Sequence, residues 1–426
     1  MTVLEHSRLQ EARAQTLALV AGLSDEQLER VHSTLMSPLV WDLGHIASFE
    51  DLWLAHRAGG LPLLHEELAE VYDAFETPRS QRGELPYLRR AEAEHYLEQV
   101  RERVAALALP EHDRLVELVV RHERQHAETM LQTLALADLP DWRPAGLAVA
   151  PAPPPAEPAS LPLSGLDLID LPGAAAFPLG AAAEGGFAYD NELPQHQVEV
   201  EPFAIGRVAV TNGDWLAFIE DGGYRRREWW SGAGWEWRCG EGAERPLRWL
   251  DERRQRTLAG IREIALENPV VHVCCHEAEA FARARGVRLP SEAEWELAAT
   301  YDDAAANKRA WPWGEEPPGP ARANLIESAE FAPVAASSLP SGAAPCGALG
   351  MIGDVWEWTA SEFDGYPGFR ADPYREYSEV FFGEHYRVLR GGSFATSALV
   401  ATPTFRNWDH PQRRQIFCGL RVAADR

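Results

Sequence analysis

The stretch Leu115-Val-Glu-Leu-Val-Val-Arg-His122-Glu-Arg-Gln-His126-Ala-Glu-Thr-Met130 decides the fold of the N-terminal part of the chain. Apolar residues at three- and four-residue spacing predict a helix over residues 111–134. His122 and His126 continue the apolar stripe where leucine would be expected. Two imidazoles four residues apart lie on one helix face and can reach a single ion. The pair alone is only moderately specific, because buried or surface histidines also show this spacing.

The same helical pattern, sparing of glycine, extends over residues 4–138 and is clearest in residues 9–20 and 96–107. Helix boundaries are marked by a capping-box pattern, a glycine pair and a proline, at Ser24-Asp-Glu-Gln27, Gly59-Gly60 and Leu109-Pro110. Several helices joined by short connections favour a four-helix bundle.

A third histidine, His45, interrupts an apolar stripe and shares a helix face with Trp41 and Phe49. Helix bundles build metal sites from side chains on facing helices, so one histidine on one helix and a pair on another predict three metal ligands. A lone core histidine is the alternative for His45. Glu123 is turned away from the histidine face. Three neutral imidazoles leave the metal open between zinc and ferrous iron.

The C-terminal part has a different texture. A proline- and alanine-rich run over residues 144–163 has the composition of an extended connector, so the sequence divides into residues 1–143, this connector and residues 164–426. Short apolar runs punctuated by Gly, Pro and Asn follow, with twelve of the fifteen tryptophans. These features predict an α+β domain with two helices, over residues 212–220 and 291–299.

Composition narrows the classes of function. The formal charge of −25 disfavours attraction to nucleic acid or anionic lipid, and no run approaches the roughly 18 apolar residues of a membrane span. We therefore expect a cytoplasmic protein with no nucleic-acid or membrane partner. Five cysteines without C-x-x-C spacing indicate neither a disulfide framework nor a zinc ribbon, and the adjacent Cys274 and Cys275 are expected to be buried thiols.

Sequence motifs add resemblances to known folds. The histidine motif around His122 and His126, together with Trp41-Asp-Leu-Gly-His45, resembles DinB-type bundles. The C-terminal part resembles the formylglycine-generating enzyme (sulfatase-modifying factor) fold, which is related to C-type lectins. Its marks are Phe177-Pro-Leu-Gly180, Glu192-Leu-Pro-Gln-His-Gln-Val198, Val210-Thr-Asn-Gly-Asp-Trp215, Arg288-Leu-Pro-Ser-Glu-Ala-Glu-Trp295, Trp313-Gly314, Gly353-Asp-Val-Trp-Glu-Trp358 and Leu389-Arg-Gly-Gly-Ser-Phe394.

This pairing, over nearly the whole chain, resembles the iron-dependent sulfoxide synthases of ergothioneine biosynthesis, also called hercynine oxygenases. The most specific matches are Thr77-Pro-Arg-Ser-Gln-Arg-Gly-Glu-Leu-Pro86, Pro373-Tyr-Arg-Glu-Tyr-Ser-Glu-Val-Phe-Phe382 and Phe405-Arg-Asn-Trp-Asp-His-Pro-Gln-Arg-Arg-Gln-Ile-Phe417. The resemblance implies Fe(II) as cofactor, O2 as co-substrate, and Nα-trimethylhistidine and γ-glutamylcysteine or cysteine as substrates. The fold analogy also allows a structural Ca2+ ion in the second domain.

The resemblance assigns roles to individual residues. It makes His45, His122 and His126 the iron ligands and Tyr374 the catalytic tyrosine. Gln125 would contact the imidazole of Nα-trimethylhistidine, and Tyr377 would hold this substrate through a water molecule. Asn407 and Trp408 would lie around its carboxylate and trimethylammonium groups. The order of Tyr374 and Tyr377 could be exchanged, and Trp408 has a core-packing alternative.

The resemblance likewise implies a clamp for the sulfur donor, made of Arg79, Arg82, Asp409 and Arg413. Guanidinium groups can bind the donor's carboxylates bidentately, and Asp409 can pair with its α-ammonium group. A solvated loop face is the alternative for the first two arginines. Residues from both domains are assigned to one reaction, so the catalytic centre is expected where the domains meet.

Other functions fit the sequence less well. Copper-dependent formylglycine formation needs a close pair of cysteines, which the stretch from Val400 to Asn407 lacks. A DinB-type zinc thiol transferase would leave the second domain unexplained, and a lectin-like fold can also bind without chemistry. An ovothiol-type histidine–cysteine sulfoxide synthase is the nearest rival, but such enzymes commonly carry a methyltransferase domain for which this chain has no room.

Overall fold

The computed structural model describes residues 3–107, 114–145 and 166–426. The chain divides into two compact units, Met1–Gly146 and Leu147–Arg426, called here the N-terminal and the C-terminal unit. The proline-rich connector predicted over 144–163 lies almost wholly outside the described residues, as does Leu109-Pro110. The predicted domain boundaries therefore stay a prediction.

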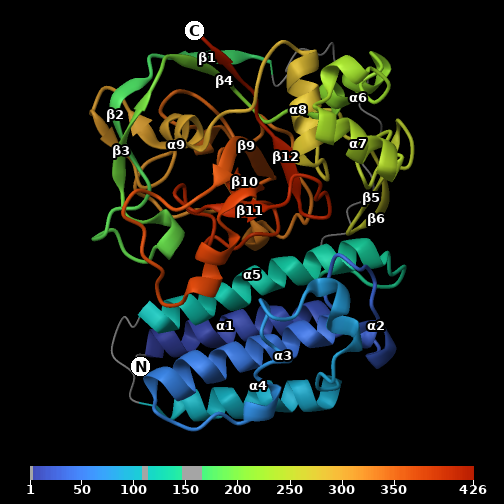
Figure 1. Ribbon diagram of the computed structural model, residues 1–426, viewed down its shortest axis with the longest axis vertical. Coiled ribbons are helices and arrows are strands. Elements are labelled where there is room, and N and C mark those ends of the chain that lie inside the picture. Colours follow the sequence, from blue (N-terminus) through green and yellow to red (C-terminus); the bar gives the residue numbers. More distant parts are fainter. Residues whose placement is uncertain (1–2, 108–113, 146–165) are drawn as a thin grey trace. The chain divides into compact units, whose positions relative to one another are not determined.

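The N-terminal unit is the predicted helical bundle (Figure 1). Its helix α3 packs against α4 and α5, and α1 packs against α5. Apolar faces of these helices form a buried core around Trp41, Leu97 and Leu131. The elements are α1 Val3–Val20, α2 Asp25–Glu29, α3 Leu39–Glu50, the π-helix η1 Asp51–Ala58, the 3-10 helices η2 Glu66–Leu68 and η3 Arg79–Glu84, α4 Arg90–Ala105 and α5 Arg114–Ala137.

Two of the predicted helix-boundary signals lie at helix ends in this unit. Ser24 and Gln27 form the capping box of α2, since each side chain binds the other's backbone N–H. The π-helix η1 ends at Gly59, and Gly60 has a φ of 69°. Helix α4 contains most of the helical pattern of residues 96–107 and begins at Arg90, where Glu92 accepts the backbone N–H of Arg89 and so caps the first turn.

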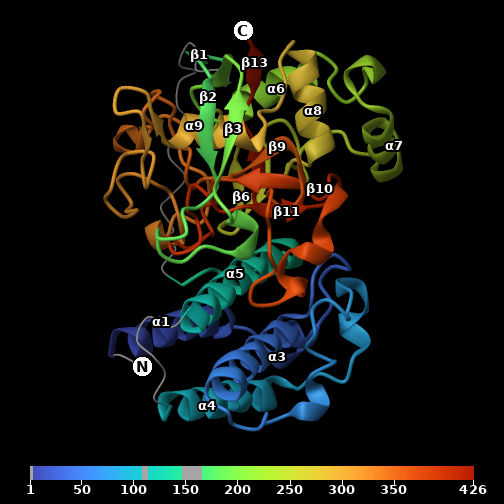
Figure 2. The same cartoon turned by 60° about the vertical axis from the view of Figure 1, so that its left-hand side comes forward.

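The C-terminal unit is an irregular α+β domain (Figure 2). Two larger sheets have the strand orders β1-β4-β13 and β11-β10-β9-β12, and three hairpins pair β2 with β3, β5 with β6 and β7 with β8. The strands are β1 Leu168–Leu171, β2 Ala174–Leu179, β3 His196–Val200, β4 Phe203–Gly206, β5 Arg254–Thr257, β6 Gly260–Glu263, β7 Tyr301–Asp302, β8 Asn307–Lys308, β9 Trp356–Phe363, β10 Gly383–Arg390, β11 Asn407–Asp409, β12 Cys418–Leu420 and β13 Ala423–Asp425.

The prediction of two helices in this unit was incomplete. Its longer helices are α6 Asn212–Glu220, α7 Gly232–Glu241, α8 Cys275–Ala284 and α9 Glu292–Thr300. The predicted helices correspond to α6 and α9. Helix α7 contains three glycines, which obscured its pattern, and α8 is capped by Cys274, an unusual residue at this position.

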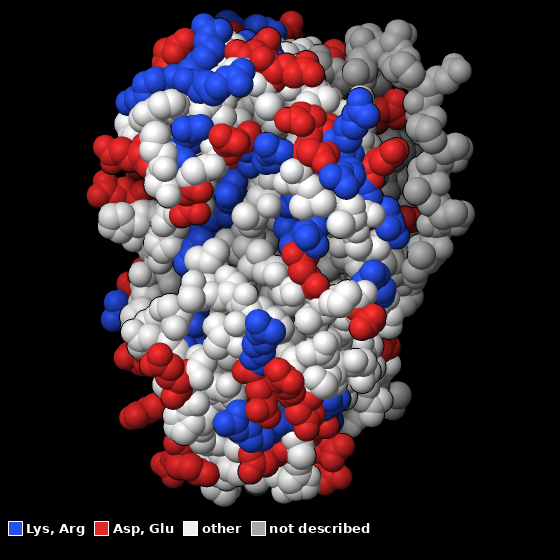
Figure 3. Space-filling view, turned by 90° about the vertical axis from the view of Figure 1, so that its right-hand side faces the viewer, with Lys and Arg blue, Asp and Glu red and all other residues white. Residues whose placement is uncertain are grey.

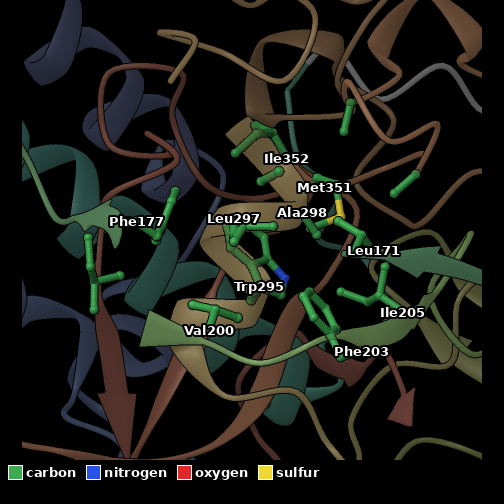
Figure 4. Packing of buried hydrophobic residues seen from close by; sticks show 14 of the residues in the cluster. Leu171, Phe177, Val200, Phe203, Ile205, Trp295, Leu297, Ala298, Met351 and Ile352 are labelled. Atoms are coloured by element: carbon green, nitrogen blue, oxygen red, sulfur yellow. The ribbon is translucent and has the colours of Figure 1, made fainter. Parts of the chain in front are cut away.

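The core of the C-terminal unit surrounds α9. Trp295 is fully buried and lies among Leu297, Ala298 and Met351 (Figure 4). Its indole N–H donates to Glu357 on β9 at 2.7 Å, which satisfies the polar atom of this ring. This core holds β9 and β10 in place, and β11 pairs with β10 at its edge. Cys274 and Cys275 are buried, free thiols, as predicted.

Acidic and basic side chains are interspersed over the face drawn in Figure 3. No helix among the described residues combines the length and hydropathy needed to cross a bilayer.

Candidate metal centre and substrate-binding residues

Three imidazoles converge inside the N-terminal unit. His45 on α3 and His122 on α5 place their Nε2 atoms 3.1 Å apart. The ring centroids of His45 and His126 are 4.6 Å apart, and those of His122 and His126 are 4.5 Å apart. One nitrogen from each ring lies within 4.8 Å of the others, so the three histidines can hold one ion. Within the described residues, these are the only three His, Cys, Asp or Glu side chains that meet this criterion.

Hydrogen bonds at Nδ1 fix two of the rings. His45 Nδ1–H donates to the carbonyl of Tyr72 at 2.7 Å, and His126 Nδ1–H donates to Oδ1 of Asp42 at 3.1 Å. Each bond leaves Nε2 with its lone pair, the form in which histidine binds a metal. The third ring, His122, stacks on Phe49 with a centroid distance of 3.6 Å.

Burial keeps two of the three rings, those of His45 and His122, uncharged. It lowers the pKa of His45 and of His122 well below the ordinary value, with proximity of the other histidines as a further cause. Both rings are therefore neutral at pH 7 and can act as ligands. Asp42 binds His126 through Oδ1, and its Oδ2 is buried without a hydrogen bond among the described residues. A divalent cation fits this donor set, because three neutral nitrogens and one nearby carboxylate favour it.

The local sequence explains how His45 reaches its partner. Gly44 precedes it on α3, and a Cβ atom there would lie 2.2 Å from the ring of Tyr72. Glycine therefore lets the Tyr72 segment lie close against α3, which brings its carbonyl to His45. The indole of Trp41 also stacks on the His45 ring, with a centroid distance of 4.9 Å, and so restricts its orientation.

Glu123, next to His122 on α5, is not a ligand in this arrangement. Glu123 accepts hydrogen bonds from Arg13 at 2.8 Å, so its carboxylate faces the bundle interior on another side of α5. The sequence prediction that Glu123 turns away from the histidine face is thus confirmed. Gln125 lies between His122 and His126 on α5 and is half-buried.

The two predicted clamp arginines differ in their surroundings. Arg82 is buried, lies over the Trp41 ring at 3.9 Å and donates to Ser37, Thr77 and Ala74. Burial and the nearby Arg79 lower the pKa of Arg82 to about 9. These bonds tie the loop before η3 to the start of α3. Arg79 is half-buried, and its Nη1 contacts Sδ of Met36 at 3.9 Å.

In the C-terminal unit, three of the predicted aromatic residues lie together. Tyr377 contacts Tyr374 edge to face at 6.2 Å and Trp408 edge to face at 5.9 Å. The indole of Trp408 stacks on Phe363 at 4.2 Å, nearly parallel. All three predicted residues are half-buried, so part of each ring reaches the surface of this unit.

The remaining predicted residues lie on or after β11. Asn407 accepts the backbone N–H of Trp408 at 2.9 Å. Asp409 lies 3.8 Å from Nε of Arg413, and Nη1 of Arg413 is buried without a hydrogen-bond partner among the described residues. A buried guanidinium N–H without a partner is costly. This pair therefore offers one carboxylate and one unused donor to a zwitterionic ligand.

The sequence prediction missed two residues that orient the histidines, Asp42 and Tyr72. Asp42 stands three residues before His45 on the same helix, which was an available signal. Tyr72 acts through its backbone carbonyl, and because every residue has a carbonyl, the residue type cannot predict such a contact.

Comparisons with known proteins match two families to different parts of the chain. Residues 8–130 match the DinB superfamily, and residues 168–426 match the sulfatase-modifying factor enzyme 1-like domain. Over the full length, the chain is 44% identical to a hercynine oxygenase from Mycolicibacterium thermoresistibile, covering 98% of this chain and 94% of that protein. It is 46% identical to one from Mycobacterium tuberculosis, covering 98% and 97%. PvdO from Pseudomonas aeruginosa superposes with a TM-score of 0.43 at 22% identity, covering 61% and 94%.

Proposed function

This chain belongs to the hercynine oxygenase family, and from that premise we propose that it joins a thiol to the imidazole of hercynine (Nα-trimethylhistidine) in ergothioneine biosynthesis. The product is a sulfoxide, formed with O2 and ferrous iron. One oxygen atom of O2 ends on sulfur and the other leaves as water, which takes the hydrogen atoms of the S–H and the imidazole C–H. The three-imidazole cluster, in a chain related to these oxygenases over its full length, carries the proposal.

His45, His122 and His126 would hold the iron. Ferrous iron, when bound, supplies the redox chemistry with O2 and a coordination position for the thiolate. The protein's part is to keep three neutral nitrogens in place, which Asp42 and the Tyr72 carbonyl support by fixing two rings. A site made only of neutral ligands from this chain leaves room for an anionic donor.

Tyr374 is proposed to act at the reacting atoms. Its phenol O–H would donate a proton or hydrogen atom as the C–S bond forms. Tyr377 contacts both Tyr374 and Trp408, which supports a role in holding the substrate beside the catalytic phenol. Hercynine itself would be bound by Gln125, Asn407 and Trp408, with the indole facing the trimethylammonium group.

Asp409 and Arg413 are proposed to bind the zwitterionic end of the sulfur donor. The unused Nη1 donor of Arg413 supports carboxylate binding, and Asp409 suits the α-ammonium group. Arg79 is the better candidate of the two clamp arginines, because Arg82 already donates to three groups of its own unit. γ-Glutamylcysteine, with two carboxylates, is the donor that such a set of cations favours over cysteine. A structural Ca2+ ion in the C-terminal unit stays a prediction.

The proposal is tested by reconstituting the metal-free protein with Fe(II) under anaerobic conditions and then adding O2. Parallel reactions contain hercynine or unmethylated histidine, each with γ-glutamylcysteine, cysteine or glutathione, and mass spectrometry identifies the products. We expect the hercynine sulfoxide, fastest with γ-glutamylcysteine. No sulfoxide with any pair would refute the proposal, and preference for histidine with cysteine would favour the ovothiol-type reaction. Zn(II) in place of Fe(II) is the control and should give no sulfoxide.

A further inference from the structure

The segment that carries Tyr374 and Tyr377 has little regular structure of its own. This segment, residues 372–382, contains two single-turn 3-10 helices, η8 Arg375–Tyr377 and η9 Glu379–Phe381. Tyr374 is the residue directly before η8. The backbone N–H of Tyr377 donates to the Tyr374 carbonyl only at 3.5 Å, a long hydrogen bond. The backbone hydrogen bond that links the two tyrosines is therefore weak, whereas the η9 turn is closed by the backbone N–H of Phe381, which donates to the Ser378 carbonyl at 2.9 Å.

One distant carboxylate ties this segment at two points. Asp190 lies in η4 Asp190–Glu192, more than 180 residues earlier in the chain. Its Oδ1 accepts the hydroxyl of Ser378 at 2.5 Å, and its Oδ2 accepts the backbone N–H of Asp372 at 3.3 Å. These two contacts lie on either side of the tyrosines. Asp190 and Ser378 are both buried, so water does not compete for the bond between them.

The residue before Asp190 supports one of the rings directly. Tyr189 stacks on Tyr377 at 4.6 Å, with the two ring planes 5° apart. Tyr377 in turn contacts the edge of Tyr374. A row of three aromatic rings thus runs from Tyr189 to the proposed catalytic phenol.

The η4 turn is itself fixed to the rest of the unit. Glu192 accepts the backbone N–H of Tyr189 at 2.8 Å and the hydroxyl of Thr404 at 2.5 Å. The guanidinium of the buried Arg406 donates to the Asn191 carbonyl at 2.8 Å. The turn can therefore act as a rigid support for the segment that carries the two tyrosines.

We infer that Asp190 is a positioning residue of the proposed reaction: it holds the 372–378 segment so that the Tyr374 phenol meets the reacting atoms. This inference rests on the proposed function and adds a role for Asp190, Ser378 and Tyr189. Asp190 acts through the tyrosines and does not contact substrate. Its loss should turn the phenol away while leaving the three histidines unchanged.

The test compares Asp190→Ala, which removes both contacts, with the milder Ser378→Ala, which removes one, in the full-length Fe(II) protein. We expect kcat for the sulfoxide to fall about 10- to 100-fold in Asp190→Ala, the loss typical of a misplaced catalytic group. The ratio of thiol sulfinic acid to sulfoxide should rise in both variants, more in Asp190→Ala. Glu376→Gln, which removes an exposed charge between the tyrosines, is the matched control and should keep the wild-type ratio.

A second comparison separates positioning from general damage. In a Tyr374→Phe background, adding Asp190→Ala should not change the product ratio further, because the phenol it positions is already gone. Hydrogen exchange of the metal-free protein should be faster in residues 372–382 of Asp190→Ala and Ser378→Ala, with β9 and β10 unchanged.

Failure of the proposed function and failure of the role of Asp190 give different results. A wild-type protein that forms no sulfoxide refutes the proposed function and the inference with it. An active wild type whose product ratio and 372–382 exchange are unchanged in Ser378→Ala and in folded Asp190→Ala refutes the inference alone. If Asp190→Ala does not fold, the Ser378→Ala result decides.

Discussion

The imidazole of His126 donates its Nδ1–H to the buried carboxylate of Asp42, 84 residues earlier in the chain, at 3.1 Å. This contact joins α3 to α5 beside the cluster of three histidines. A carboxylate behind a metal-binding histidine fixes the tautomer and the ring direction, and it raises the ring's basicity. Asp42 is therefore expected to affect metal binding although it is not a ligand.

We predict that Asp42→Ala weakens metal affinity about 10- to 100-fold, the usual cost of losing such a partner. The metal affinity of Asp42→Asn should lie between those of Asp42→Ala and wild type, because the amide oxygen of asparagine can still accept the Nδ1–H of His126. Competition titration of the metal-free protein with Co(II) and a chelator measures the affinity. Equal affinity in Asp42→Ala and wild type would show that the contact does not support the site.

Tyr374→Phe should divert the reaction from sulfoxide to thiol sulfinic acid. The variant lacks the phenol proton that accompanies C–S bond formation, while both oxygen atoms of O2 can still be added to the thiol. Tyr377→Phe should keep the sulfoxide as main product and raise KM for hercynine, because it lacks only the hydroxyl that holds substrate. Product analysis at saturating substrate decides the order of the two tyrosines. The opposite pattern would exchange their roles.

Trp408→Leu should raise KM for hercynine about 5- to 30-fold, which corresponds to roughly 1–2 kcal/mol of cation–π attraction. Phe363 stacks on one face of the indole, and Tyr377 and Phe381 also contact this ring, so Trp408 belongs to a group of aromatic side chains that a cation can approach. Trp408→Phe should retain part of the affinity. A matched control is Trp235→Leu on α7, which removes a half-buried tryptophan from another part of the unit. A KM in Trp408→Leu equal to that of the control would favour a packing role.

The sequence predicts the histidine cluster well because its signals are local. His122 and His126 are one helical turn apart, and His45 replaces an apolar residue of its own helix, so periodicity marks all three as candidates and the family resemblance makes them ligands. The supports of these residues are not local. Asp42 reaches His126 across 84 residues, and Asp190 reaches Ser378 across 188. Such pairings depend on how helices and turns pack, which no spacing within one element shows.

The same distinction applies to Arg82. Its position in an arginine-containing loop indicated a solvated face or a ligand clamp, but the side chain is buried against Trp41 and binds two carbonyls. A single arginine in a loop gives no sequence signal for stacking on a tryptophan 41 residues earlier in the chain. Its proposed contact with the sulfur donor stays a prediction.

Arg13→Leu should strongly destabilise the N-terminal unit. Arg13 is buried and donates to Glu50 and to Glu123 at 2.8 Å each, and both carboxylates are almost fully buried. Removing one partner leaves buried charges with fewer counter-ions, which typically costs about 3–5 kcal/mol. Denaturant unfolding followed by circular dichroism measures the loss. The control Arg89→Leu breaks an exposed pair with Glu29 and should change stability little. Similar effects in both variants would contradict this ranking.

The buried carboxyl of Asp354 should make the stability of the C-terminal unit depend on pH. Its Oδ1 accepts N–H groups from Asn324 at 2.8 Å and from the backbone of Val334 at 2.9 Å. Burial is the main cause that raises the pKa of Asp354 to about 6, against an ordinary value of 3.8. The folded protein therefore keeps this proton in a pH range in which the unfolded chain has released it.

The sign follows from this difference. Below about pH 4 both states are protonated and burial of the group costs least, whereas above about pH 6 the folded state must carry a buried charge. The neutral carboxyl of Asp354 thus stabilises the folded protein at pH values below the pKa that Asp354 has in the unfolded chain. This stabilisation is lost as the pH rises through the higher pKa that Asp354 has in the folded protein. Two pKa units correspond to roughly 3 kcal/mol.

Asp354→Asn isolates this effect, because asparagine keeps the accepting oxygen, tolerates the φ of 60° and does not titrate. The free energy of unfolding of wild type minus that of Asp354→Asn should fall by roughly 2–2.5 kcal/mol between pH 4 and pH 7, because the unfolded carboxyl is already partly ionised at pH 4. Tryptophan fluorescence during urea unfolding reports mainly on the C-terminal unit, which holds twelve of the fifteen tryptophans. The exposed Asp303→Asn is the control and should show no such change. A difference that is constant or rises with pH would mean that Asp354 is ionised throughout this range in the folded protein.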